Sequence, residues 1–213
     1  MTAAHASSRA RKAEGLYDPA FEHDACGVAF VATLSGVPSH AIVAQGLEAL
    51  RNLDHRGAVG SDPKTGDGAG MLLQIPEAFL RSEVDFQLPR QGAYAVGNAF
   101  LPTDPELAAK AKAGIEQIAS EENLRVLGWR QVPTSDSSLS DVTRSNMPYF
   151  EQLFVTAKGA PLMGIGLDRL AYCLRRRVEH ETGTYFASLS ARTIVYKGML
   201  TTNQLPQVVP ELQ

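Results

Sequence analysis

The residue with the most reactive side chain near the start of the sequence is Cys26, which opens the apolar run Cys-Gly-Val-Ala-Phe-Val. Free cysteines are among the most buried residues, so a packed core thiol is the default interpretation. Residues 1–25 contain no apolar block long enough for a signal peptide. If they were removed, Cys26 would carry both a thiol and a free α-amine. The sequence therefore leaves two roles open for Cys26.

A second group of polar residues lies in the glycine- and aspartate-rich segment 53–70. Arg56 follows His55 at the end of a predicted helix, where both side chains could complement the helix dipole. A planar guanidinium is equally suited to lie against a thiolate or a carboxylate. Residues 66–70 read Gly-Asp-Gly-Ala-Gly, but this run precedes a strand and lacks the lysine of a phosphate-binding loop. We interpret its glycines as turn formers and not as a nucleotide site.

These residues need a scaffold, and the hydrophobic pattern predicts a mixed one. Strands are predicted over residues 27–34, 71–75, 94–101, 124–132, 150–156, 185–190 and 193–199. Helices are predicted over residues 40–53, 77–84, 105–122 and 166–182, with a short one at the end. The polar segment 133–146 predicts a mobile loop and is the best candidate boundary within the chain. Such a mixture indicates an α+β or layered α/β sandwich.

Composition limits the classes of partner. The chain has 213 residues and a formal net charge of −3, so it lacks the basic surface that nucleic acids or anionic membranes attract. No apolar block is long enough to span a membrane. The two cysteines, Cys26 and Cys173, form neither a disulfide framework nor a metal site, and we interpret Cys173 as structural because it borders a helix stripe. A reducing cytoplasm is the compartment that this composition favours.

Four stretches carry a family resemblance: residues 26–30 (Cys-Gly-Val-Ala-Phe), 53–58 (Leu-Asp-His-Arg-Gly-Ala), 66–70 (Gly-Asp-Gly-Ala-Gly) and 195–200 (Val-Tyr-Lys-Gly-Met-Leu). In this order and spacing they resemble the amino-terminal glutaminase domain of the glutamate synthase large subunit, a class II glutamine amidotransferase. The last two stretches argue against other class II amidotransferases.

The resemblance implies an α+β fold of the N-terminal-nucleophile hydrolase type, an αββα sandwich that is incomplete at its C-terminal end. It implies a propeptide-like leader at residues 1–25 and a partial class II glutamine amidotransferase domain at residues 26–213. Cys26 is then the catalytic nucleophile, with its own α-amine as base, and Arg56 positions the thiol and favours its ionised form. His55 and Asp67 are interpreted as loop structure.

The same resemblance implies L-glutamine as substrate and the remaining glutamate synthase domains or subunit as partners, with the released ammonia passing to 2-oxoglutarate. It implies FMN and an iron–sulfur cluster on downstream domains that this chain lacks, and no cofactor in this chain. Two cysteines are also too few to ligate a cluster.

The sequence departs from the family in one respect. The family's oxyanion donors come from an Asn-Gly pair, and a His-Ser-Arg-Phe stretch holds the substrate's α-carboxylate, but the chain contains neither. Losing one oxyanion donor typically lowers a rate by about 100- to 1000-fold. Two functions therefore stay open: part of a glutamine-hydrolysing enzyme, or a non-catalytic remnant or binding piece of the same domain. We expect little or no activity from the 213-residue chain alone.

Overall fold

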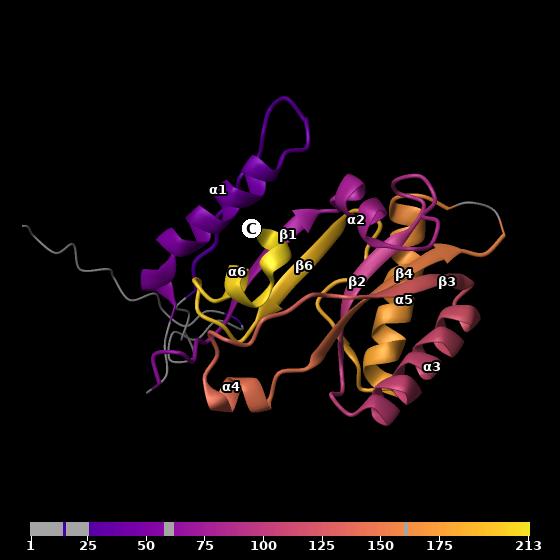
Figure 1. Ribbon diagram of the computed structural model, residues 1–213. Coiled ribbons are helices and arrows are strands. Elements are labelled where there is room, and N and C mark those ends of the chain that lie inside the picture. Colours follow the sequence, from indigo (N-terminus) through magenta and orange to yellow (C-terminus); the bar gives the residue numbers. More distant parts are fainter. Residues whose placement is uncertain (1–14, 16–25, 58–61, 160–161) are drawn as a thin grey trace, which may run out of the picture.

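The structure, a computed structural model, describes residue 15 and residues 26–57, 62–159 and 162–213. The leader predicted at residues 1–25 therefore lies, apart from Gly15, outside the described residues. The rest of the chain forms two antiparallel sheets with helices packed around them (Figure 1). The mixed α+β architecture predicted from the sequence is confirmed.

The larger sheet has four strands: β2 (Ala95–Leu101), β3 (Leu124–Gln131), β4 (Tyr149–Ala157) and β5 (Tyr185–Phe186), in the order β3-β4-β2-β5. β4 pairs antiparallel with both β2 and β3, so these two strands run parallel to each other without touching. A helix connects β2 to β3, as the sequence pattern indicated.

Two long helices cover one face of this sheet. α3 (Pro105–Glu121) begins where the Asp104 carboxylate accepts hydrogen bonds from the first turn, and α5 (Ile165–Glu181) buries Leu167, Ala171 and Leu174. Both helices lie side by side in Figure 1 and pack on inward side chains of β2 and β4, such as Leu153. Burying an apolar stripe of this kind is what stabilises helices of ordinary propensity.

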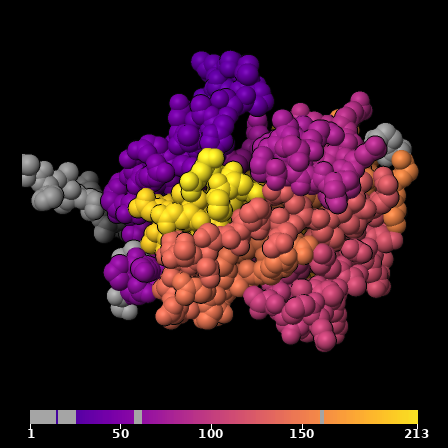
Figure 2. Space-filling model, viewed as in Figure 1, coloured from indigo at the N-terminus to yellow at the C-terminus, as the bar shows by residue number. Residues whose placement is uncertain are grey.

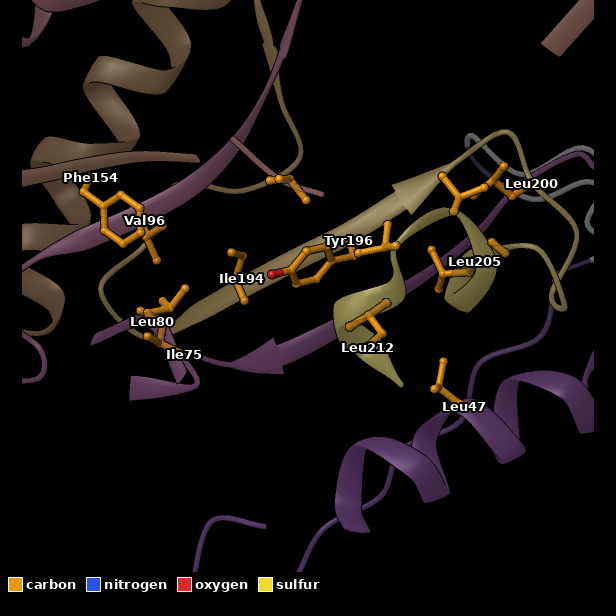
Figure 3. Close-up of a cluster of buried hydrophobic side chains, with 14 of the residues drawn as sticks. Leu47, Ile75, Leu80, Val96, Phe154, Ile194, Tyr196, Leu200, Leu205 and Leu212 are labelled. Atoms are coloured by element: carbon orange, nitrogen blue, oxygen red, sulfur yellow. The ribbon is translucent and has the colours of Figure 1, made fainter. Parts of the chain in front are cut away.

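The other face of the four-stranded sheet packs on the second sheet, formed by β1 (Ala69–Gln74) and β6 (Thr193–Gly198). Ile194 and Tyr196 of β6 share a core cluster with Val96 of β2 and Phe154 of β4 (Figure 3). The cluster is closed by α1 (His40–Asn52), α2 (Glu77–Glu83), α6 (Leu205–Val208) and the 3-10 helix η3 (Pro210–Leu212). Figure 2 shows this carboxyl-terminal part, in yellow, wedged between α1 and the rest of the molecule.

A buried ion pair ties η3 to the sheets. Arg130 of β3, only 8% exposed, donates to Glu211 at 2.9 Å and to Gln152 of β4 at 3.0 Å. Glu211 also accepts a hydrogen bond from the Tyr196 hydroxyl at 2.9 Å. Burial opposes the charged guanidinium, but the hydrogen bond and the charge of Glu211 outweigh it and raise the pKa of Arg130. Arg130 also pairs with Glu83 at 3.1 Å, but removing Arg130 would leave the buried Glu211 carboxylate without a cation, so the pair helps to fix where η3 lies.

Three sequence predictions are wrong in detail. Residues 27–34 form no strand: they are extended and turn residues whose apolar side chains are exposed, with Phe30 at 93%. A strand needs a hydrogen-bonded neighbour, which an apolar run cannot supply by itself. The segment 133–146 is no boundary, because it contains α4 (Asp141–Ser145), buries Leu139 and donates from Ser135 N to the Val208 carbonyl at 3.0 Å. The predicted strand 185–190 shortens to β5 and a single bridge, Val96 to Ser190.

Candidate active site

Arg56 is placed by the end of α1. Ser39 caps the start of this helix by accepting from Ala41 N, and the helix passes directly into the 3-10 helix η2 (Asp54–Arg56). Within η2, Arg56 N donates to the Leu53 carbonyl at 2.8 Å and Gly57 N to the Asp54 carbonyl at 3.1 Å. These bonds fix the shape of the turn and leave His55 and Arg56 exposed to solvent.

Cys26 is exposed, and its neighbour Gly27 lies against this turn. A Cβ atom added to its neighbour Gly27 would stand 3.0 Å from Cδ2 of Leu53 and 3.1 Å from Cβ of Arg56. The backbone at Gly27 therefore lies directly against the side chain of Arg56, and a larger residue would push the two apart. The structure thus places the chain neighbour of Cys26 against Arg56, although α1 separates them in the sequence.

Beyond Gly27 the chain leaves the body of the protein. The segment that leads to α1 projects outward at the top of Figure 1, with Val28 at 91% and Leu34 at 106% exposure. Cys26, at the start of this segment, is exposed to solvent. The prediction of a buried core thiol, which the heptapeptide alone favoured, is wrong.

The Gly-Asp-Gly-Ala-Gly loop at residues 66–70 is held by the chain that follows β6. A Cβ atom added to Gly66 would stand 2.3 Å from the carbonyl carbon and oxygen of Leu200, closer than any side chain can approach. Asp67 lies near η2: its Oδ1 would be 3.5 Å from a Cβ atom on Gly57. The loop glycines permit a close backbone crossing, as the sequence predicted, and the crossing brings this loop to η2.

The turn after β6 forms hydrogen bonds with η2 and with the segment before the glycine loop. Thr202, 8% exposed, donates its hydroxyl to Asp54 of η2 at 2.5 Å. Gln204 donates to the carbonyls of Lys64 and Ser138 at 2.9 Å each, and its own Oε1 accepts from Thr201 N at 2.8 Å. Sequence reasoning missed Thr202 and Gln204, because their partners are 148 and 140 residues away and nothing in the local pattern announces them.

Cys173, the second cysteine, lies far from this site along α5. The apolar stripe of α5 is buried as predicted, but Cys173 itself is exposed on the solvent side of the helix. It has no structural role in the core that its position beside the stripe suggested. It instead offers an exposed thiol in an unrelated environment.

A hollow of about 460 Å³ lies between α1 and the carboxyl-terminal segment. Its lining includes His40 and Arg51 of α1 and Asn203, Pro206 and Gln207 beyond β6. Neither Cys26 nor Arg56 lines it, so it is not the place where a substrate would meet the thiol.

Among the described residues, no group of three or more histidine, cysteine or acidic side chains could hold a metal ion. In the same part of the chain no helix has the length and apolar character required to cross a membrane.

Comparison with known proteins identifies the family of the chain. A family model described as "Glutamine amidotransferases class-II" matches residues 26–213. The chain is 43% identical over 208 residues to the glutamate synthase [NADPH] large chain of Bacillus subtilis, covering 95% of this chain and 14% of that protein. It is 40% identical over 214 residues to glutamate synthase [NADH] of Saccharomyces cerevisiae (93% and 10%), and 39% identical over 184 residues to ferredoxin-dependent glutamate synthase 2 of Synechocystis (84% and 12%). The chain therefore spans about a seventh or less of the length of these relatives.

Proposed function

Since the chain belongs to the class II glutamine amidotransferases, we propose that it is the glutamine-hydrolysing domain of a glutamate synthase, with Cys26 as nucleophile. Residues 26–213 are that domain, and residues 1–25 are a leader removed to expose Cys26 as the new amino terminus. The family match begins at Cys26, which supports this division. The ammonia that the domain releases would serve glutamate synthesis in the remaining domains or subunit, where FMN and an iron–sulfur cluster would belong.

The observation that carries the proposal is the contact of Gly27 with Arg56. It sets the residue after Cys26 against the side chain of Arg56, whose exposed guanidinium has no ion pair among the described residues. A positive charge next to a thiol favours the thiolate, which is the reactive form.

The proposed reaction uses the thiol and the α-amine of Cys26, one glutamine and one water molecule. The α-amine of Cys26 accepts the thiol proton, and the sulfur attacks the side-chain carbonyl carbon of glutamine. The C–N bond breaks, the amine returns the proton, and ammonia leaves a thioester on Cys26. Water then adds to the thioester, releasing glutamate and restoring the thiol. Arg56 positions the sulfur and favours its anionic form throughout.

The decisive experiment measures glutamine-dependent ammonia release in the natural polypeptide that carries this sequence. Cys26→Ala abolishes release, whereas Cys173→Ala, the matched control at the other exposed thiol, keeps at least half of it. Intact-mass measurement of the active protein finds residues 1–25 missing. Equal loss in the two cysteine variants, with folding intact, or an active protein that retains the leader, would overturn the proposal.

The second function that the sequence left open is a non-catalytic remnant or binding piece of the same domain. Under this alternative, glutamine binds without turnover and Cys26→Ala changes nothing. Burst release of one equivalent of ammonia per protein, even without further turnover, would exclude it.

A further inference from the structure

The turn that carries Arg56 is hydrogen-bonded to Thr202, which lies 148 residues away in the sequence from its partner Asp54. The backbone bonds inside η2 are local, so they determine the shape of the turn but not its position relative to the β1–β6 sheet. That position depends on a contact between elements. Leu47 of α1 packs in the core cluster, and the Thr202 hydroxyl adds the contact at η2 itself by donating to the Asp54 carboxylate at 2.5 Å.

Thr202 is itself rigidly held. It is 8% exposed and lies in a turn where Thr201 N donates to Oε1 of Gln204. Nε2 of Gln204 in turn donates to the Lys64 and Ser138 carbonyls, which holds the turn against those two segments. A hydrogen bond from a buried hydroxyl to a carboxylate is stronger than one between neutral groups. The turn after β6 can therefore act as a fixed support against which η2 is oriented.

The contact also decides which group the Asp54 carboxylate binds. Asp54 and Arg56 are two residues apart in one exposed turn, yet Asp54 accepts from Thr202, and the Arg56 guanidinium has no ion pair among the described residues. A carboxylate paired with the guanidinium would cancel much of the positive charge available to a neighbouring thiol. Engaging Asp54 elsewhere preserves that charge.

We propose that Asp54 and Thr202 are a positioning pair for Arg56: Thr202 fixes η2 through Asp54 and keeps the Asp54 carboxylate from neutralising the Arg56 guanidinium. This rests on the proposed role of Arg56 next to the nucleophile. The titratable and charged groups at this turn are Asp54, His55 and Arg56 on η2 itself and Asp67 in the glycine loop next to Gly57.

The test follows the rate at which iodoacetamide alkylates each cysteine from pH 6 to 10 in the 213-residue chain, by peptide mass spectrometry. Cys173 is the internal reference, since it is exposed on α5 and remote from η2. Thr202→Val slows alkylation of Cys26 about 3- to 10-fold near pH 7 and shifts its profile to higher pH, because the freed carboxylate pairs with Arg56. Thr202→Ser keeps the hydroxyl and therefore has the wild-type profile, and the alkylation rate of Cys173 is unchanged in every variant.

Arg56→Ala separates this inference from the function beneath it. If Arg56→Ala shifts the Cys26 profile while Thr202→Val matches the wild type, the positioning pair is wrong and the role of Arg56 stands. If Arg56→Ala leaves the profile unchanged, the role of Arg56 itself fails. A Thr202→Val profile that Thr202→Ser does not restore would reduce Thr202 to general packing and likewise overturn the pair.

Discussion

Replacing Gly66 by alanine tests the crossing on which the arrangement of the site depends. The new Cβ atom would stand 2.3 Å from the carbonyl carbon and oxygen of Leu200 and 2.4 Å from Thr201 N. Ordinary contacts begin near 3.4 Å, so the two chain segments must separate by about 1 Å. All three atoms belong to backbone, and no side-chain rotation can relieve the overlap.

The cost can be worked from the bonds that a 1 Å shift breaks. The hydrogen bond from Gln204 to the Lys64 carbonyl, 2.9 Å long, would lengthen beyond bonding range. Loss of one such bond destabilises by about 1 kcal/mol, and overpacking a well-packed crossing by about 1 to 3 kcal/mol. We expect the free energy of unfolding of Gly66→Ala to fall by about 2 to 4 kcal/mol.

Gly166→Ala is the matched control. This glycine lies in the first turn of α5, where the nearest atom to an added Cβ is Cδ2 of Leu162 at 3.8 Å. Alanine in a helix is more favourable than glycine by about 0.5 to 1 kcal/mol, so the control is unchanged or slightly more stable.

Urea unfolding measures both variants, followed by the fluorescence of Trp129, the chain's single tryptophan, and by circular dichroism. For a chain of this size the loss corresponds to a melting temperature lower by about 4 to 16 °C. A Gly66→Ala protein within about 0.5 kcal/mol of the wild type, with the same denaturant slope, would show that the crossing is not as close as described.

Two further predictions concern stability at high pH and self-association. Burial, then the charge and hydrogen bond of Glu211, raise the pKa of Tyr196 above its ordinary value of 10.0, so the folded state keeps a proton that the unfolded state releases. The contribution of Tyr196 to the free energy of unfolding is therefore constant below pH 10 and falls above it by about 1.4 kcal/mol per pH unit. We expect Tyr196→Phe to flatten the decline in urea midpoint between pH 10 and 11.5. Parallel curves for the variant and the wild type would contradict this. The exposed apolar segment before α1, with Val28 at 91% and Phe30 at 93%, predicts self-association in sedimentation velocity that Val28→Thr/Phe30→Ser reduces, whereas an equally monodisperse wild type would contradict it.

Local signals predicted most of the secondary structure. Ser39 and Asp104 marked the starts of α1 and α3 because capping depends only on neighbouring residues, and the stripe of α5 follows from helical period alone. Pairing between strands is not local. The sequence of residues 27–34 does not indicate whether a strand lies beside them, and they pair with none in the described residues. The sequence of residues 69–74 likewise does not indicate that β6 is their partner.

The candidate site was predicted to the same extent. Cys26 and Arg56 are predicted from short consecutive motifs that carry the family resemblance, and their roles stay predictions. Thr202 was not, since a threonine in a polar turn is ordinary until the fold brings it to Asp54. The polar segment 133–146 misled for a related reason: Ser140 is polar but buried, because Thr65 and Thr143 satisfy its hydroxyl.

The bond between Asp54 and Thr202 has a consequence for when the site can exist. It joins residues 148 positions apart, and closing a flexible loop of that length costs about 4 kcal/mol of chain entropy in addition to a constant. At about 5 to 20 residues per second, the ribosome needs about 7 to 30 s to travel from one partner to the other. Throughout that interval α1 and η2 have been made, but the turn that orients Arg56 has not. A nascent chain therefore carries Cys26 without its ordered neighbour, and whatever reactivity Arg56 gives the thiol begins only when β6 has paired with β1.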